Sequence, residues 1–503
     1  MPKWTLEEAR TVIESTGNHR WYPEHLREKI ASARIAAFLY RQRNKRKLTV
    51  RSIGNTKAKR ATNKALIAAN RRVAQLARGI VLRAKRGAGL KPVHDCHPTL
   101  LLARRKDSIF LDGILPHRRT NWVPLAARLK TQRTARLMVE NFSFLRNPAG
   151  TMQALRAIAE AEQDCLSAQI DFMDTTCADI GPWLVLAMMR SHLAPIFTGG
   201  AISNQMSKVL DALRLKDQLR FSVTPSWEGE RDIWAFPLHM RRAAGTSTSP
   251  TVQIDPQAKE KAGDALCAAI NTWLSECADQ ELTAHGRRLV KKITGECLDN
   301  AERHSRREFE NDGDWMLTGF MEKVRGADGH RFRCQLAFLS VGSSISETVQ
   351  DCAPETLDAM NRYVAAHKPS MPNHRSADGH LRTIFALQDM VTRDRHAYAE
   401  GRGGTGFRDI ICFFWDLAGG EGDATLSVVS GRTCLTIDNT FRDLVFPQPS
   451  ETFNIWFNDT NDHTRPPDHA MVRELDSDFR GALITMGFTL DVGYLEKTAD
   501  GDR

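Results

Sequence analysis

Glu296 and Asn300 are the two side chains in this sequence whose types and spacing point most directly to chemistry. They are four residues apart and follow a helical pattern over residues 287–294, so on a helix they lie on one face. An Asn oxygen can ligate Mg²⁺ on the phosphates of a nucleotide, and a Glu can orient or deprotonate an attacking water or hydroxyl. The same spacing is also common on solvated helix faces, so the surrounding residues have to decide between the two interpretations.

The string ECLDNAERHS, residues 296–305, resembles the N-box of the GHKL superfamily. This superfamily includes the ATP-binding domains of gyrase-type enzymes, Hsp90, MutL and histidine kinases. The resemblance implies an α/β sandwich of the Bergerat type that binds ATP with Mg²⁺. It also implies roles for three residues: Glu296 as general base, Asn300 as Mg²⁺ ligand, and Asp299 as part of the pocket wall.

A glycine cluster at residues 401–407 (GRGGTGF) resembles the second glycine box of that superfamily, which closes over ATP. Glycines there allow close backbone approach, and the N-terminus of the following helix offers amides and a positive dipole to phosphates. Residues 426–431 and 479–484 resemble the closing strands of the domain, with Ala482 where Thr is common. The resemblance implies nucleotide contacts from Gly401, Gly403, Gly404, Thr405 and Gly406.

The first glycine box, aligned with residues 339–345, departs from the superfamily pattern Asp-x-Gly-x-Gly-Ile. Gly342 is retained, but Ser340 replaces the Asp that accepts a hydrogen bond from the adenine amino group, and Ser344 replaces the second glycine. A hydroxyl in place of the carboxylate loses about 1.5–3 kcal/mol. Three outcomes follow: ATP binds about tenfold to hundredfold more weakly, a water or neighbouring group replaces the carboxylate, or the domain is a pseudo-enzyme.

The middle of the chain resembles a STAS domain, the small fold of anti-sigma-factor antagonists. In that family a Ser follows the Asp of the second motif and is phosphorylated by a partner GHKL kinase. Here that position is Ile180, so any switch must be conformational or use another residue. A generic α/β domain is the alternative. The segments that carry the likeness are AQIDFMD at 168–174, ADIGP at 178–182, PIFTG at 195–199 and VLDAL at 209–213.

Positive charge is concentrated in the first 140 residues, which hold 32 Lys and Arg against 9 Asp and Glu, although the whole chain carries only +10. Between residues 45 and 91 the basic clusters alternate with apolar runs, which predicts an amphipathic basic helix. Such a helix could follow a phosphate backbone, with help from the pair at 118–119, or it could be solvated or dock on the acidic remainder. The candidate contacts to nucleic acid or a partner are Lys45, Arg46, Lys47, Lys57, Lys59, Arg60, Arg71, Arg72, Lys85 and Arg86.

Alternating helices and short strands after residue 150 predict an α+β protein. We expect a basic, mostly helical region over 1–140, a STAS-like α/β domain over 150–243 and a GHKL-like ATP-binding domain over 254–495. The small polar stretch 245–252 reads as the linker between the last two.

Composition argues against a secreted or membrane-spanning protein. Ten cysteines without a CxxC pair indicate reduced thiols and a cytoplasmic location. The longest apolar stretch, 180–189, falls short of the roughly 20 residues that a spanning helix needs, and the first residues lack the apolar core of a signal peptide. Residues 94–97 (HDCH) look like metal ligands but have no second cluster at zinc-finger spacing.

These features predict an ATP-binding regulatory protein: a GHKL-type ATPase, a nucleotide switch or a serine-kinase-like enzyme. Its STAS-like domain would bind a protein partner, and its basic region would contact nucleic acid or protein. A role in bacterial stress or phage defence follows by analogy alone. The alternative is a nucleic-acid-binding scaffold whose GHKL domain has lost its nucleotide, which Ser340 and Ser344 favour.

Overall fold

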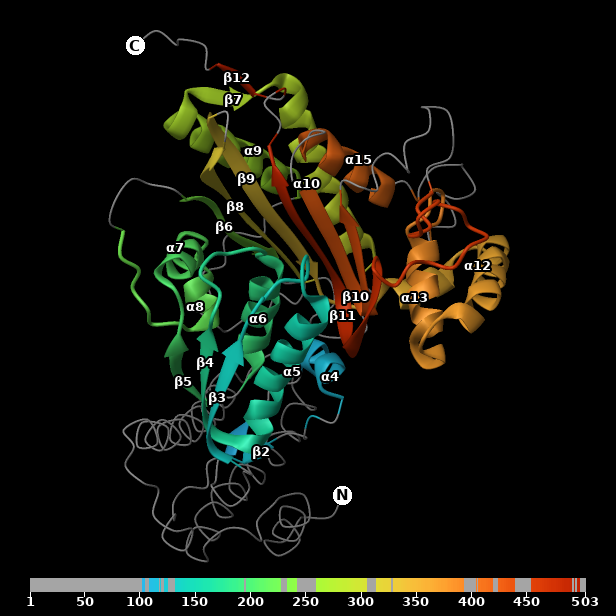
Figure 1. The fold of residues 1–503 in the computed structure, drawn as a ribbon, viewed down its shortest axis with the longest axis horizontal. Helices are drawn as coiled ribbons and strands as arrows, with labels where there is room; N and C mark the ends of the chain where they lie inside the picture. The colour runs from blue at the N-terminus through green and yellow to red at the C-terminus, as the bar shows by residue number, and fades with distance from the viewer. Residues whose placement is uncertain are drawn as a thin grey trace, which may run out of the picture.

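The protein has an α+β fold in which an antiparallel sheet and a parallel sheet lie in separate layers (Figure 1). The sequence prediction of the α+β class is thus confirmed. The basic clusters between residues 45 and 91, and residues 94–97, lie outside the part of the chain that the structure describes. This computed structural model describes residues 102–104, 108–116, 118, 122–124, 132–193, 196–227, 233–241, 259–304, 314–326, 329–392, 404, 406–418, 424–438, 454–490, 493 and 495–497.

A five-stranded antiparallel sheet forms the centre of the fold, in the order β10-β11-β9-β8-β6. Strands β8 and β9 form a hairpin, and β11 pairs with β9 so that Ala482 lies opposite Ser340. The strands are β6 (Ile233–Arg241), β8 (Trp315–Gly326), β9 (Gly329–Ser340), β10 (Ala424–Asp438) and β11 (Val472–Thr489).

Both faces of β9 are buried, because each face contributes to a different hydrophobic core. Leu336 and Phe338 belong to one core, whereas Ala337 and Leu339 belong to the other. Side chains alternate along a strand, so burial on both sides requires a continuous apolar run in place of an apolar–polar alternation. The central sheet is therefore a wall shared by two layers.

Long helices cover the first face of the sheet (Figure 1). Helix α15 is the most apolar of them and places Phe414 and Trp415 in the core, both fully buried. The helical region expected over 256–308 is divided into α9 and α10 by β7 (Gln280–Leu282), which pairs with β12 (Leu495–Lys497). The long helices are α9 (Lys259–Ala278), α10 (Ala284–His304) and α15 (Gly406–Ala418). Beside them, α13 (His374–Ala386) packs against β10, and α12 (Pro354–His367) packs on α13.

A smaller α/β unit packs against the second face (Figure 1). Its parallel sheet has the order β3-β4-β5, and α6 is buried along Gly181–Arg190 because it lies between layers. Trp183 of α6 packs against Phe172 of β4, with ring centroids 4.4 Å apart. The elements are α4 (Ile109–Ile114), β3 (Gln132–Val139), α5 (Pro148–Asp164), β4 (Cys165–Phe172), α6 (Gly181–His192), β5 (Phe197–Ala201), α7 (Asn204–Ala212) and α8 (Leu215–Leu219). A short pair, β1 (Leu102–Arg104) with β2 (Trp122–Pro124), precedes them.

Asp179 is the polar link between this unit and the central sheet. Its buried carboxylate accepts hydrogen bonds from Thr485 Oγ1 of β11 at 2.5 Å, from the Phe144 amide at 2.7 Å and from the Gly181 amide at 2.8 Å. Burial raises the pKa of Asp179, and these hydrogen bonds oppose the rise. Nearby, the Gln335 side chain of β9 donates to the Ala178 carbonyl at 3.1 Å.

Several strands were not anticipated from the sequence, and one expected strand is wrong. β3, β6 and the short strands β1, β2, β7 and β12 were missed, while the strand expected near residues 220–223 is an irregular segment after α8. β6 contains Pro237, which a strand tolerates at an edge or a bulge. It is the edge strand of the sheet, and its register with β8 shifts between Phe236 and His239. The central sheet therefore begins before the expected linker at 245–252.

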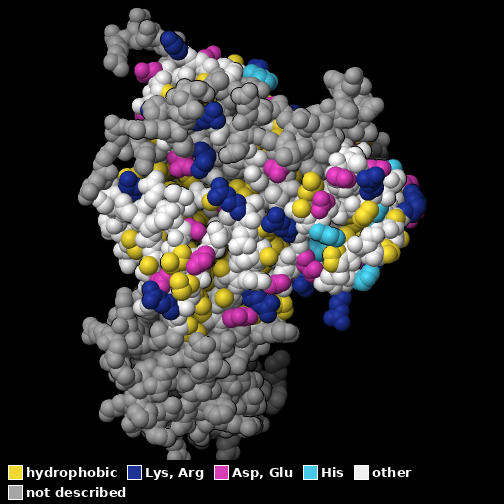
Figure 2. All heavy atoms as spheres, viewed as in Figure 1, with side chains coloured by type: hydrophobic (Ala, Val, Ile, Leu, Met, Phe, Trp, Pro, Cys, Tyr) yellow, Lys and Arg dark blue, Asp and Glu magenta, His cyan; other side chains and the backbone are white. Residues whose placement is uncertain are grey.

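Arg118 is not available for the polyanion contact considered for it. Its guanidinium is buried, and Nε donates to Glu162 Oε2 at 2.9 Å. On the visible face of the described residues, basic and acidic side chains are interspersed (Figure 2). None of the helices in the described ranges combines the length and the apolar character that a membrane crossing demands.

Replacing Thr485 with Val tests the link between the layers. The change keeps the shape of the side chain but leaves the buried Asp179 carboxylate with one donor fewer, so we expect the free energy of unfolding to fall by about 1–3 kcal/mol. Urea unfolding measures it. Thr489→Val is the control, because Thr489 is partly exposed at the end of the same strand. Equal stability of the two variants would contradict the role of Asp179.

Candidate functional site

A cavity of about 760 Å³ opens between α10, the end of β9, the middle of β11 and the start of α15. The fourth side is formed by the segment after β9, which includes α11 (Ile345–Thr348) and the end of α13. The described residues expected from the sequence to form a site, seven in all, line this one cavity: Glu296, Asp299, Asn300, Ser340, Gly342, Gly404 and Gly406.

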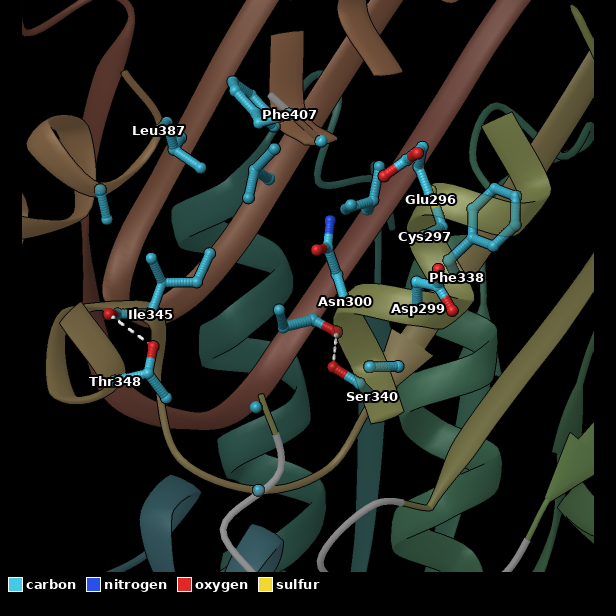
Figure 3. Close-up of a pocket in the computed structure, with 18 of the residues that line it drawn as sticks. Glu296, Cys297, Asp299, Asn300, Phe338, Ser340, Ile345, Thr348, Leu387 and Phe407 are labelled. Atoms are coloured by element: carbon cyan, nitrogen blue, oxygen red, sulfur yellow. Dashed lines mark hydrogen bonds between the residues drawn. The ribbon is translucent and has the colours of Figure 1, made fainter. Parts of the chain in front are cut away.

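Helix α10 places Glu296 and Asn300 at the cavity because its opposite side is apolar. Ile293, Cys297 and Leu298 are buried in the core under the central sheet, and this stripe fixes the rotation of the helix. Glu296 and Asn300 are left half-buried on the cavity side, with the Asn300 amide near the centre of the residues drawn in Figure 3. Burial raises the pKa of the Cys297 thiol, so it stays protonated as a core residue.

Gly406, the first residue of α15, lies directly against the Glu296 and Asn300 side chains. A Cβ built on it would be 3.0 Å from Glu296 Oε2 and 3.2 Å from Asn300 Nδ2. Gly404 has φ +76°, and a Cβ there would meet the Met390 carbonyl carbon at 2.5 Å, so this position requires glycine. The fold thus joins two segments that lie 106 positions apart, from Asn300 to Gly406. Gly401, Gly403 and Thr405 lie outside the described residues.

Ser340 ends β9 at the cavity wall, where its Oγ donates to the Ala482 carbonyl at 3.3 Å (Figure 3). The neighbouring Gly481 has φ +114°, and its carbonyl accepts from Ser430 Oγ at 2.6 Å. Ser344, the second departure from the glycine-box pattern, has a structural explanation. It is the N-cap of α11, and its amide donates to Glu347 Oε2 at 2.8 Å.

Apolar residues line the cavity as well, and two of the lining residues, Leu387 and Thr348, were not anticipated from the sequence. Figure 3 shows Ile345, Leu387 and Phe407 on the side of the cavity across from Asn300, and they make that wall apolar. Thr348 also lines it, with its hydroxyl donated to the Ile345 carbonyl at 3.0 Å. Ile345 and Phe407 end the two glycine-box-like segments, whereas Leu387 and Thr348 carry no motif and only their packing identifies them.

The cavity is acidic among the described residues. Glu296, Asp299 and Asp351 line it, and no Lys or Arg of the described chain does so. Basic groups on neighbouring elements are paired elsewhere, as in Arg408 with Asp389 at 3.1 Å. A phosphate ligand would therefore have to arrive with a cation. Asn300 and Glu296 are the oxygen donors best placed to receive that cation, although no group of three His, Cys, Asp or Glu in the described ranges forms a ready metal site.

The α13 wall is held on the sheet by buried polar contacts. His380 Nδ1 is 2.8 Å from Thr433 Oγ1 of β10, and Ser376 Oγ donates to Glu474 of β11 at 2.6 Å. Burial lowers the pKa of His380 to about 4; Glu474 opposes this effect, and Arg432 and His469 add to it.

The lowered pKa of His380 predicts loss of stability in acid. In the unfolded chain the imidazole takes up a proton near pH 6.5, whereas the folded protein keeps it neutral down to about pH 4. The unfolded state therefore binds more protons between these values, and the free energy of unfolding falls as the pH drops through them. We expect wild type to lose about 1–2 kcal/mol more than His380→Gln between pH 7 and pH 5 in urea unfolding. Parallel profiles for the two proteins would contradict this assignment.

Comparison with known proteins identifies no relative of this chain. No protein-family model, no curated protein and no solved structure matches it. A function for the cavity therefore has to be derived from its own residues and geometry.

Proposed function

We propose that the cavity is a GHKL-type nucleotide site that binds ATP with Mg²⁺. One observation carries the proposal: the backbone of Gly406 lies against Glu296 and Asn300 at the wall of a cavity of about 760 Å³. The N-box-like helix and the described end of the second glycine box are thereby neighbours in space. A volume of this size is in the range of small-molecule sites.

The order of the elements supports the same assignment. The chain runs from the Glu296 helix through the β8–β9 hairpin to the first glycine box, then through the second glycine box into α15, β10 and β11. Long helices lie on one face of the resulting antiparallel sheet. This arrangement is consistent with the α/β sandwich that the resemblance implies for 254–495, with β6 added at the edge.

Three parts of the cavity would contact a triphosphate and its Mg²⁺, each in a different way. Asn300 supplies an amide oxygen to Mg²⁺, which when bound would neutralise phosphate charge next to the acidic lining. The N-terminus of α15 directs backbone amides and its positive dipole end toward the phosphates. Glu296 is placed beside Gly406 to accept a proton from a water or hydroxyl that attacks the terminal phosphate.

The wider role that we propose is nucleotide-dependent regulation. The smaller α/β unit, which resembles a STAS domain, packs on the sheet that forms the cavity floor. Nucleotide binding in the cavity would therefore change the surface that this unit offers to a protein partner. The basic region before residue 100 would contact nucleic acid or a partner protein. A cytoplasmic location fits the nine described cysteines, which are free thiols. A role in stress or phage defence stays an analogy.

A second candidate is a nucleic-acid-binding scaffold with an empty nucleotide cavity. Two observations favour it. Ser340 stands in place of a carboxylate, and the acidic lining contains no Lys or Arg among the described residues. Under this alternative, Asn300→Ala would leave the protein's function intact, and binding to any duplex through the basic region would weaken steeply as salt increases.

Calorimetry with a non-hydrolysable ATP analogue and Mg²⁺ separates the two candidates. We expect wild type to bind and Asn300→Ala to bind about tenfold to hundredfold more weakly, since it loses a contact to a charged group. Asn361→Ala is the control, because Asn361 is exposed on α12. For turnover, Glu296→Gln should retain binding but slow hydrolysis by about a hundredfold or more. No binding by wild type would favour the scaffold.

Gly406→Ala probes the contact between the two motifs. The added methyl would crowd Glu296 and Asn300 at 3.0–3.2 Å, so we expect weaker nucleotide binding without loss of the fold. Gly295→Ala is a matched control in α10, because nothing lies within 4 Å of its added Cβ. That control should bind normally and gain about 0.5–1 kcal/mol of stability. Equal binding by both variants would show that the ligand does not use this junction.

A further inference from the structure

If the phosphates lie where proposed, the nucleotide base lies at the other end of the cavity, beside Ser340 and Ile345. Glu296, Asn300 and Gly406 mark the phosphate end. In Figure 3 the Ser340 side chain lies beyond Asn300, on the side away from Glu296, and Ile345 forms an apolar wall opposite α10. A flat, mostly apolar base fits this end, with its polar edge toward Ser340.

Ser340 is a polar side chain at this end that can still change its hydrogen bond. Its bond to the Ala482 carbonyl is long, at 3.3 Å, and a hydroxyl can rotate. The Thr348 hydroxyl is held by the Ile345 carbonyl at 3.0 Å. Asp299 and Asp351 each take part in a further interaction within the protein. The Ser340 hydroxyl is therefore a group at this end that can meet C6 of a purine.

A hydroxyl and a carboxylate recognise this position differently. An ionised carboxylate only accepts hydrogen bonds, so it favours the 6-amino group of adenine and repels the 6-oxo group of hypoxanthine or guanine. A serine hydroxyl both donates and accepts. While Ser340 donates to Ala482, its lone pairs can accept from an amino group; after rotation it can donate to an oxo group.

We infer that Ser340 relaxes the base specificity of the cavity, so that it takes 6-oxopurine nucleoside triphosphates about as well as ATP; the inference rests on the proposed nucleotide site. The substrate class is then purine nucleoside triphosphates in general. Ser340 is the residue that sets the specificity, and it acts through direct contact with the base.

Calorimetric titration of the full chain with ATP and with ITP, each with Mg²⁺, tests the inference. The two nucleotides differ at C6 and in the hydrogen on N1, so they isolate the contact. We expect the two Kd values of wild type to agree within about tenfold. Ser340→Asp should shift the preference toward ATP by about tenfold to hundredfold, and Ser340→Ala should show no preference shift.

The possible outcomes distinguish failure of this inference from failure of the proposed nucleotide site. If wild type binds ATP but binds ITP a hundredfold more weakly or not at all, the nucleotide site stands and relaxed specificity is overturned. If wild type binds neither nucleotide, the proposed function fails and the inference falls with it. Should Ser340→Asp not fold, as judged by circular dichroism, the wild-type comparison of ATP with ITP still decides.

Discussion

The burial of the central sheet on both faces is the constraint on which the rest of this structure depends. Alternate residues of β9 enter separate cores, Phe338 on one side and Leu339 on the other. Neither layer can move away from the sheet without exposing apolar surface, which costs about 25 cal/mol per Å². The helical layer that carries Glu296 and Asn300 and the smaller α/β unit are thus fixed on the same wall.

Asp179 provides buried polar contacts across this largely apolar interface. A buried carboxylate is tolerated only when hydrogen bonds satisfy it, and its donors come from both the small unit and β11. Thr485, the donor on β11, lies three positions from Ala482, the residue that receives the Ser340 hydroxyl. The loop that carries Asp179 is therefore tied to the strand that forms the floor of the cavity. This provides a short physical route between the two units.

The cavity combines an acidic lining with the start of a helix. Carboxylates would repel a triphosphate, while the α15 N-terminus attracts it. Under the proposed function, a divalent cation carried by the nucleotide would resolve this conflict, because it would turn Glu296 and Asn300 into favourable contacts. The serines around the first glycine box also serve the fold: Ser344 begins α11, and Ser430 satisfies the Gly481 carbonyl where β11 departs from regular pairing.

The sequence by itself determined the local features of this protein: the α+β class, the helix that presents Glu296 and Asn300 on one face, and the helix after the glycine cluster. These depend on residue spacing within one element, which is readable along the chain. Tertiary structure alone decided that Gly406 lies against Asn300, that Ser340 faces Ala482, and that Leu387 closes the apolar wall. β6 was missed because Pro237 breaks the strand pattern, and only pairing with β8 through a register shift makes it an edge strand. Contacts between distant segments depend on which strands pair and in what register, and no local pattern encodes that choice.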